Sequence, residues 1–340
     1  MTSFQNRRAA AVENDKLRVT VLQEGGHIAE ILDKQAGVNP LWVPPWPSIE
    51  PSTHSGEAYG TGSEAKLLSG IMGHNLCLDV FGGPSAEEFT AGIGVHGEGS
   101  VAPYSIDVHG HTLRMRADLP LAQIQFERTI ELEGSKAIIG ESVTSLCPFD
   151  RPIGWTQHVT LGPPFLQPGV TQFRATATRS KVFESSFGAH DYLKPGAEFD
   201  WPNAPRIDGG AADLQVMNGS PASCAFTAHL MNPALKDAWF MAFSPAAKLV
   251  FGYLWKPADF PWLGIWEENH SRTHAPWNGR TLARGMEFGV SPIPESRRQM
   301  VERGALFGVP AYRWLPAKGR LTAKYCAILT HSDSMPEKIA

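Results

Sequence analysis

The sequence contains few cysteines and has no pattern that would join them. Its 340 residues include four cysteines, which stand far apart and form no Cys-x-x-Cys pair. Small disulfide scaffolds and zinc knuckles need closely and regularly spaced cysteines. We therefore expect neither, and we interpret the four residues as reduced and mostly buried thiols.

An excess of one charge and long apolar runs are also missing. Thirty Lys and Arg residues stand against 34 Asp and Glu residues, a formal net charge of −4. This balance supplies no field for a polyanion, which argues against nucleic acid or an anionic membrane as a partner. No segment approaches the roughly 20 apolar residues that span a bilayer. The first residues lack the apolar core of a secretory signal, so we expect a cytoplasmic protein.

Glycine, proline and tryptophan, by contrast, are abundant. With 33 Gly and 27 Pro, long helices have little room, and short strands joined by turns are favoured. The ten Trp residues suit the binding of flat ligands rich in C–H groups, such as sugars. The length alone suggests about two domains of roughly 150 residues, but no linker divides the chain.

Apolar and polar residues alternate through most of the chain, which is the pattern of strands with one buried face. The clearest strands are Leu17–Gln23, Thr112–Asp118, Ala122–Leu132 and Ala137–Ser145. Further strands are predicted at Trp155–Leu161, Gln172–Thr178, Leu214–Met217, Ser223–Leu230, Ala238–Phe243, Leu249–Trp255, Trp262–Glu267, Arg284–Ser291 and Leu321–Ile328. Glycine-rich turns at hairpin spacing indicate antiparallel pairing. We therefore predict an all-β fold in one domain over residues 1–340, with a core at about residues 17–328 and terminal extensions at 1–16 and 330–340.

Three segments depart from the alternating pattern. Glu295–Arg303 has helical spacing between Pro294 and Gly304 and predicts a short helix. Pro40–Ser69 and Gly70–Ser100 resist assignment as strands and predict two long loops. Because loops of this length in a compact domain usually carry function, we place much of the binding site in them.

His158 is the first candidate for chemistry. On the strand Trp155–Leu161, alternation puts Trp155 on one face and His158 on the other, between two threonines. A histidine on a strand is often a structural, hydrogen-bonded residue. The polar neighbours and the rigid Gly-Pro-Pro segment that follows this strand give a functional role of His158 the same weight as a structural one.

Glu287 is the second candidate. Its apolar neighbours on the strand face the core, whereas Glu287 lies on the opposite face between Gly285 and Gly289. Missing side chains on both sides of a carboxylate leave space for a ligand to approach. The alternative interpretation is an exposed strand glutamate beside a bulge.

His96 is the third candidate, in a loop where Gly94 and Gly97 let the backbone come close to a ligand. His74, which follows Gly73, has a similar setting, and both segments are equally compatible with surface turns. No Gly-x-Gly-x-x-Gly between a strand and a helix and no Gly-Lys-Ser/Thr occurs, so a phosphate-cradling loop is not supported.

The order of these segments resembles the galactose mutarotase (aldose 1-epimerase)-like superfamily. The resemblance extends over about Leu17 to Ile328, and the order and spacing of the segments are more specific than any single motif. An arginine-rich segment usual in the family has no counterpart in Gly70–Asp79, so the chain resembles a divergent member. The segments that carry the resemblance are Val95–Gly97, Trp155–Gly162, Met286–Gly289 and Trp314–Tyr325.

This resemblance implies a large antiparallel β-supersandwich and a sugar or sugar derivative as the small-molecule partner. It implies that Glu287 is a general base, His158 a general acid and His96 a hydrogen-bonding partner near the ring oxygen, in a reaction that interconverts anomers. A carboxylate and an imidazole on opposite sides of the sugar ring suffice for this chemistry, so neither a metal nor an organic cofactor is expected. Further candidates are His74, Asp79, Trp266 and Glu267 for hydroxyl recognition, and Trp155 and Trp201 as walls of the pocket.

Two other function classes stay open. The first is a carbohydrate-binding β-sandwich without catalysis, and the second is a metal-dependent isomerase or oxygenase built on His96, His158 and Glu287. A phosphorylated sugar is also compatible, because Arg174, Arg179 and Arg272 lie near the candidate segments, although scattered arginines are usually solvated. The sequence indicates neither the sugar nor an oligomeric state.

Overall fold

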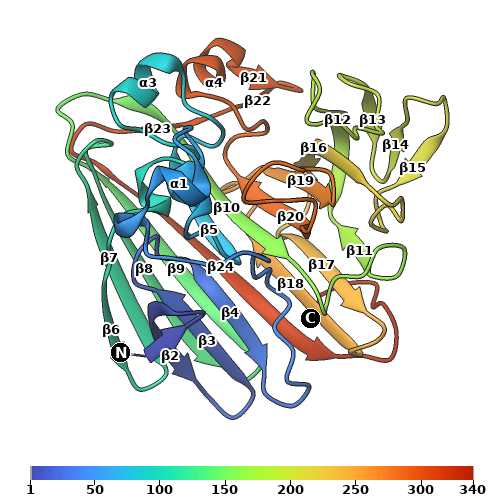
Figure 1. Cartoon of the computed structure of the whole chain (residues 1–340), viewed down its shortest axis with the longest axis horizontal. Coiled ribbons are helices and arrows are strands. Elements are labelled where there is room, and N and C mark those ends of the chain that lie inside the picture. Colours follow the sequence, from blue (N-terminus) through green and yellow to red (C-terminus); the bar gives the residue numbers. More distant parts are fainter. Residues whose placement is uncertain (1, 340) are drawn as a thin grey trace.

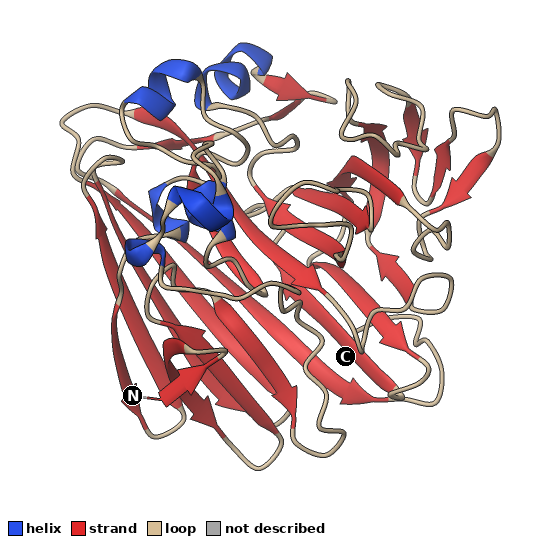
Figure 2. Cartoon of the chain, viewed as in Figure 1, coloured by secondary structure: helices blue, strands red, loops and turns tan. Residues whose placement is uncertain are grey.

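The computed structural model describes residues 2–339, which form two large antiparallel sheets and a few short helices (Figures 1 and 2). No helix among these residues has the length and apolar character needed to cross a membrane. The observed architecture is therefore the all-β fold predicted from the alternating pattern, in the form of the large antiparallel supersandwich that the family resemblance implied.

The larger sheet has twelve described strands, and its spatial order differs from the chain order. β23 (Arg313–Leu315) is off the main path and pairs with β10. The other strands, in spatial order, are β1 (Thr2–Phe4), β2 (Arg7–Glu13), β3 (Leu17–Leu22), β4 (Ile28–Asp33), β5 (His74–Asp79), β10 (Arg151–Leu161), β20 (Leu282–Gly289), β19 (Trp262–Asn269), β16 (Ser223–Met231), β12 (Ala177–Val182) and β13 (Glu198–Asp200).

The smaller sheet has eight strands among the described residues. In spatial order these are β11 (Gln172–Ala175), β17 (Ala238–Ser244), β18 (Leu249–Trp255), β24 (Arg320–His331), β9 (Lys136–Ser145), β8 (Ile124–Glu133), β7 (Thr112–Leu119) and β6 (Ser105–His109). Two small hairpins pair β14 (Asn203–Pro205) with β15 (Ala211–Asp213), and β21 (Ala305–Leu306) with β22 (Val309–Pro310). The helical turns are η1 (Pro51–Thr53), α1 (Gly56–Tyr59), α2 (Ala65–Leu68), α3 (Ala86–Thr90), η2 (Glu98–Ser100) and α4 (Arg297–Arg303).

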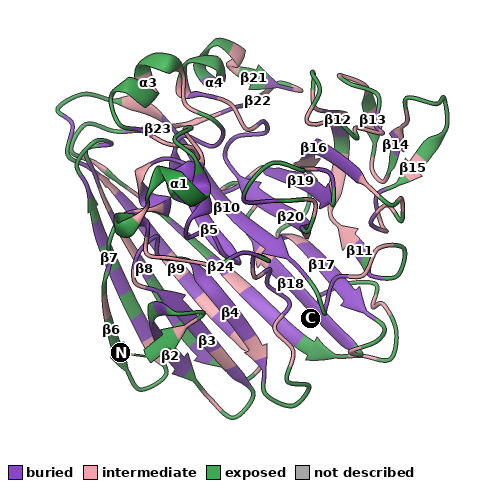
Figure 3. Ribbon diagram, in the orientation of Figure 1, coloured by how far each residue is buried: buried purple, intermediate pink, exposed green. Residues whose placement is uncertain are grey.

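The two sheets pack face to face around a shared apolar core. One continuous hydrophobic cluster includes Val19 and Ile31 from the larger sheet and Phe126 and Ile139 from the smaller one. On β7 and β8 the residues alternate between buried and more exposed, because the outer face of the smaller sheet meets solvent (Figure 3). Period-two alternation in the sequence reports this one-sided burial.

The central strands of the larger sheet are buried on both faces. All residues of β5 and β19 are buried, and so is nearly all of β10 and β20 (Figure 3). The outer face of this sheet is covered by residues of the chain segments 42–71 and 293–306, with Phe81 and Trp277, and these form a second apolar cluster with β16 and β19. The space between this face and its cover is where a site can be enclosed.

A buried polar network ties the two sheets together. The Arg128 Nε atom donates to Glu141 Oε1 at 2.6 Å, and neither side chain is exposed to solvent. Glu141 also accepts hydrogen bonds from Trp155 Nε1 and Gln157 Nε2 of β10, and from the Tyr325 hydroxyl of β24. The carboxylate on the smaller sheet therefore holds the central strand of the larger sheet through two donors, Trp155 and Gln157, and is itself fixed by Tyr325 of its own sheet.

The structure corrects several of the predicted elements. β5 was not predicted, because a strand buried on both faces shows no alternation, and it lies within the stretch interpreted as a loop. Residues 2–13 are not an extension but form β1 and β2 of the larger sheet. Leu214–Met217 is not a strand and has only an isolated bridge at Val216. The helix at Glu295–Arg303 is confirmed as α4, and Cys77, Cys147, Cys224 and Cys326 are free thiols.

We expect Arg128→Met to lower the free energy of unfolding by about 3–5 kcal/mol, since it leaves the Glu141 carboxylate buried and without its charged partner. Urea unfolding followed by circular dichroism measures this change. Arg320→Met is the matched control, because Arg320 pairs with Glu127 on the solvent side of the same sheet, where an ion pair contributes about 0–1 kcal/mol. Equal effects of the two substitutions would contradict the structural role of the network.

Candidate active site

A cavity of about 300 Å³ lies between the outer face of the larger sheet and the segments that cover it. More than half of the residues that line it come from the stretch of residues 40–100, where the sequence placed much of a binding site. The lining residues are Glu64, Leu67, Leu68, Ile71, Phe81, Gly82, Gly83, Val95, His96, His158, Phe187, Phe226, Trp266, Arg272, Trp277, Glu287 and Pro294.

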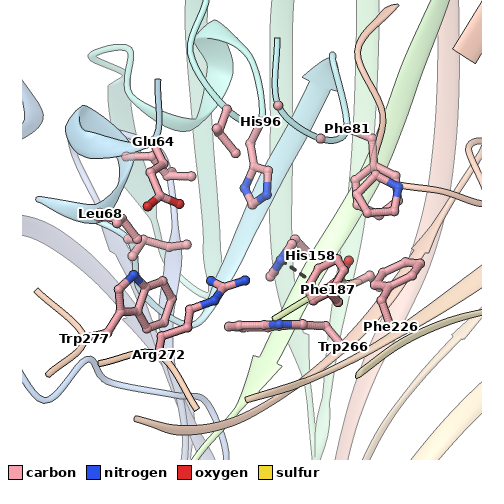
Figure 4. A pocket seen from close by; sticks show the side chains of 17 residues that line it. Glu64, Leu68, Phe81, His96, His158, Phe187, Phe226, Trp266, Arg272 and Trp277 are labelled. Atoms are coloured by element: carbon pink, nitrogen blue, oxygen red, sulfur yellow. Dashed lines mark ion pairs between the residues drawn. The ribbon is translucent and has the colours of Figure 1, made fainter. Parts of the chain in front are cut away.

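The pairing of β10 with β20 brings His158 and Glu287 together. The two residues are direct partners in the antiparallel register, and both point to the outer face of the sheet. The Nε2 atom of His158 lies 3.1 Å from Oε1 of Glu287 (dashed line in Figure 4). This approach lacks the direction of a hydrogen bond, and Oε1 has no hydrogen-bond partner among the described residues. The carboxylate oxygen is therefore free to accept from a ligand.

Glycines make room for the Glu287 side chain. A Cβ atom added at Gly285 would lie 2.3 Å from Oε1 of Glu287, and one at Gly289 would lie 2.3 Å from the Thr156 hydroxyl. Gly264, the partner of Glu287 on β19, would bring a Cβ atom 3.5 Å from the Cβ of Glu287. The Glu287 carboxylate can lie against the sheet because Gly285 lacks a side chain, whereas the absence of one at Gly289 leaves room for Thr156.

His96 reaches the cavity from the loop that follows β5. Its backbone is left-handed, with φ +65°, a conformation that costs a non-glycine residue free energy and is often held at functional sites. The loop is fastened by hydrogen bonds from His96 N to Gly82 O at 3.2 Å and from Leu78 N to His96 O at 3.2 Å. The His96 ring lies 4.7 Å from the ring of His158, so both imidazoles face one end of the cavity.

The second ring nitrogen of each histidine has a partner in the protein. Asn75 Nδ2 lies 3.2 Å from Nδ1 of His96, and the Thr160 hydroxyl lies 3.1 Å from Nδ1 of His158. The Asn75 amide N–H can only donate, so Nδ1 of His96 accepts and the ring proton of His96 is on Nε2. The Thr160 hydroxyl can donate to Nδ1 of His158 or accept from it, so the neutral ring of His158 can carry its proton on Nδ1 and leave Nε2 free toward Glu287. Asn75 is a site residue that the sequence analysis missed, since β5 itself was not recognised.

Burial shifts the protonation of all three groups toward their neutral forms. Loss of solvation lowers the pKa of His158 to about 4 and lowers the pKa of His96 well below its ordinary value. It raises the pKa of the Glu287 carboxyl well above the range of an ordinary glutamate. Opposite shifts of adjacent acidic and basic groups in a cavity are typical of sites that transfer protons.

Aromatic side chains form the rest of the cavity wall. The Trp266 ring lies 6.0 Å from the His158 ring, and Trp277 packs against Trp266 at 6.2 Å (Figure 4). Phe187 and Phe226 stack at 5.7 Å. Of these four residues only Trp266 was a sequence candidate, because apolar residues in loops and strands give no signal that separates a wall from a core.

His74 and Trp155 do not reach the cavity, which corrects the expectation that they contact a ligand there. His74 is fully buried between the sheets, where its ring nitrogens lie 2.9 Å from the Tyr253 hydroxyl and 3.0 Å from Gln157 Oε1. Trp155 is in the inter-sheet core. Strand alternation explains the position of Trp155, since residues 155 and 158 of one strand point to opposite faces.

Asp79, Trp201 and Glu267 are also outside the cavity, so their expected contacts with a ligand are corrected as well. Asp79 ends β5 and is held by ion pairs to Arg151 and Arg297. Trp201 packs against His229 at 5.1 Å. Glu267 follows Trp266 on β19 and points to the other face, where Oε2 accepts from the Tyr192 hydroxyl at 2.5 Å.

The structure thus brings together four of the sequence candidates: His96, His158, Glu287 and Trp266. It also adds Arg272, one of three arginines considered for a phosphorylated sugar; Arg174 and Arg179 do not line the cavity. Within residues 2–339, no group of three or more His, Cys, Asp or Glu side chains is arranged to hold a metal ion.

Comparison with known proteins identifies the fold. Neither a protein-family model nor a curated protein sequence matches the chain. A candidate aldose 1-epimerase from Klebsiella pneumoniae superposes with a TM-score of 0.71 at 13% identity, over 98% of this chain and 82% of that chain. The chain has the galactose mutarotase-like fold. A galactose mutarotase-like protein from Clostridium acetobutylicum gives a TM-score of 0.63 at 12% identity, over 97% of both chains. For a candidate aldose 1-epimerase from Escherichia coli K12 the TM-score is 0.64 at 12% identity, over 95% of this chain and 99% of that chain.

We expect His158 in this galactose mutarotase-like fold to stay neutral down to about pH 4, because its imidazole is buried. Nitrogen–proton correlation NMR of the ring measures its protonation, with His158→Gln to assign the signal. The unfolded chain takes up this proton near pH 6.5, so the stabilising contribution of the neutral ring is present above that pH and is lost as the pH falls toward 4. Protonation of the folded protein near pH 6.5 would contradict the burial of this ring.

Proposed function

We propose that the protein catalyses the interconversion of the anomers of an aldose or aldose derivative. The observation that carries this proposal is the contact of His158 Nε2 with Glu287 Oε1 at 3.1 Å, beside His96, at one end of a cavity. The galactose mutarotase-like fold of the chain supports it. Glu287, His158 and His96 are the proposed catalytic residues.

The reaction needs a base for one oxygen and an acid for its neighbour. Removal of the O1 proton and protonation of the ring oxygen break the bond between C1 and that oxygen, which gives the open-chain aldehyde. Rotation about the C1–C2 bond and closure by the reverse proton transfers then yield the other anomer. Because both oxygens are bonded to C1, the acid and the base act best when they lie a few ångströms apart, rather than on opposite sides of the ring as we expected from the sequence.

The Glu287–His158 pair balances these proton transfers. With its proton on His158 and its charge on Glu287, the carboxylate takes the O1 proton while the imidazolium protonates the ring oxygen. The pair then holds the proton on Glu287, and transfer across the short contact to His158 restores the starting state. Before the substrate binds, burial favours the form in which both groups are neutral, with the proton on Glu287. The Nε2–H of His96 would donate a hydrogen bond to the ring oxygen.

The cavity offers a suitable environment for a pyranose ring. Trp266 lies beside His158 and presents an aromatic surface on which the C–H groups of a sugar pack. The indole Nε1 of Trp266 is buried without a hydrogen-bond partner among the described residues. Of the residues that the sequence suggested for substrate binding, we propose Trp266, which lines the cavity.

We expect Glu287→Gln to slow anomer exchange by about 10²–10⁴-fold, because the amide cannot accept the O1 proton. Exchange NMR with a panel of aldoses, corrected for the spontaneous rate, measures this loss. Glu302→Gln is the control, since Glu302 is an exposed carboxylate on α4, and its rate should match that of the unmodified protein. Full activity of Glu287→Gln, or no acceleration of any aldose by the unmodified protein, would refute the proposal.

We expect the rate of catalysed exchange to fall as the pH rises through the raised pKa of Glu287, because the pair then loses the proton that it shares. The midpoint of this decline should lie above the ordinary pKa of a glutamate, about 4.3. The pH dependence of kcat/KM, which reports the free enzyme, measures it. A rate that stays constant up to the pH at which the protein unfolds would contradict the one-proton pair.

The non-catalytic interpretation makes a different prediction. If the protein only binds carbohydrate, saturable sugar binding persists in His158→Ala and Glu287→Gln but is lost in Trp266→Ala. Isothermal titration calorimetry of the three variants, together with the exchange measurement, therefore separates a binding protein from an enzyme.

A further inference from the structure

We infer that the substrate carries an anionic group, a carboxylate or a phosphate, which Arg272 binds at the Trp277 side of the cavity. This inference rests on the proposed function and names the class of aldose on which the site acts. It comes from the cationic side chain that lines the cavity and from the groups around it.

The guanidinium of Arg272 is held among aromatic rings. Its central carbon lies 4.7 Å from the centre of the Trp277 ring, 5.4 Å from Trp266 and 5.8 Å from Phe187. Cations are attracted to the faces of such rings. Figure 4 shows the guanidinium between Trp277 and Trp266, pointing toward the middle of the cavity. The aromatic contacts therefore orient the positive charge toward a bound ligand.

Glu268 holds Arg272 from behind. Its Oε2 atom lies 3.5 Å from Nε of Arg272, and its Oε1 atom accepts hydrogen bonds from the backbone N–H groups of Ser271 and Arg272. The Glu268 side chain has no exposed surface. The two terminal Nη atoms of Arg272 have no hydrogen-bond partner within residues 2–339. A guanidinium held in this way presents two N–H groups in the fork that matches a carboxylate or a phosphate.

Two further unpaired donors belong to aromatic residues that line the cavity. The indole Nε1 atoms of Trp266 and Trp277 are both buried and without a partner in the described part of the chain. Buried N–H groups without a partner are rare in folded proteins and point to a missing acceptor. Glu268 pairs with Arg272 at Nε, and the other carboxylate that lines the cavity, Glu64, is 44% exposed and lies 3.8 Å from Nε2 of His274. Neither carboxylate therefore occupies the two terminal Nη atoms of Arg272, which are left for a ligand.

The excess of donors distinguishes an anionic group from a hydroxyl. A sugar hydroxyl offers one donor of its own, which needs an acceptor, whereas a carboxylate or phosphate oxygen only accepts. The guanidinium and the two indoles supply donors, and the free acceptor Oε1 of Glu287 is already assigned to the reacting end. The chemistry of this side of the cavity therefore suits a group that accepts several hydrogen bonds and carries negative charge.

The test compares sugars that share one ring and differ only at C6. Exchange NMR with D-glucose, D-glucuronate and D-glucose 6-phosphate, and with the three matching galactose compounds, gives kcat/KM for a neutral, a carboxylate and a phosphate form. We expect at least one anionic form to exceed its neutral partner by tenfold or more. The carboxylate and phosphate arms show which of the two anions the site accepts.

Arg272→Met should remove this preference. We expect the ratio of kcat/KM for the anionic sugar to kcat/KM for its neutral partner to fall at least tenfold. Arg272→Lys keeps the charge but not the fork and should recover part of the loss. Arg280→Met is the matched control, since Arg280 is an exposed arginine of the same loop and does not line the cavity.

The outcomes separate this inference from the proposed function. Catalysis of neutral sugars with no anionic preference, or a preference that survives Arg272→Met, would overturn the inference and leave the proposed function intact. If no sugar is turned over, the proposed function fails, and ligand-observed NMR still tests recognition. In that case, the inference is supported if glucuronate or glucose 6-phosphate binds more tightly than methyl glucoside and Arg272→Met removes the difference. Equal binding of the anionic and neutral sugars overturns it.

Discussion

The antiparallel register of β10 against β20 is the constraint on which the candidate site depends. It sets His158 opposite Glu287 on the outer face of the larger sheet while Val159 and Met286, the next pair, face the inter-sheet core. A slip of β10 by one residue would turn its side chains to the opposite face, so that His158 would point into the apolar core and away from Glu287. The same register thus fixes the core and the reacting pair.

The polar network beneath the cavity supports this register from the other side. Trp155 and Gln157 of β10 donate to Glu141 on the smaller sheet, and Arg128 balances the charge of that carboxylate. Alternate residues of β10 therefore serve two functions: one set ties the sheets together, and the other lines the cavity. A strand fixed on its inner face by directional hydrogen bonds holds His158 in a defined position on its outer face.

The cavity combines a reacting end of few polar groups with a largely aromatic wall. Low solvent access at His158 and Glu287 favours the neutral forms of these two groups. A site of this kind depends on its ligand to complete the hydrogen bonding, because Oε1 of Glu287 and both indole nitrogens have no partner in residues 2–339. The anionic sugar that we infer would satisfy both ends.

Alternation, applied consistently, predicts much of the site. It placed His158 and Glu287 on the faces that they occupy. It also puts Trp155 on the face opposite His158, and Glu267 on the face opposite Trp266, so the choice of Trp155 and Glu267 as site residues conflicted with the pattern itself. His96 was located by its glycine-rich loop and the family resemblance. Asn75 and β5 gave no signal, because a strand buried on both faces has no alternation to detect.

The sequence by itself determined the fold class and the faces of β10 and β20, since period-two patterning follows directly from strand geometry and one-sided burial. Only the tertiary structure decided which polar residues meet. His96, Glu287 and Arg272 are far apart along the chain, and their convergence depends on strand order, on the loops that cover the outer face and on the space left by glycines. Long-range packing of this kind has no local signature, and it is what turns scattered side chains into a site.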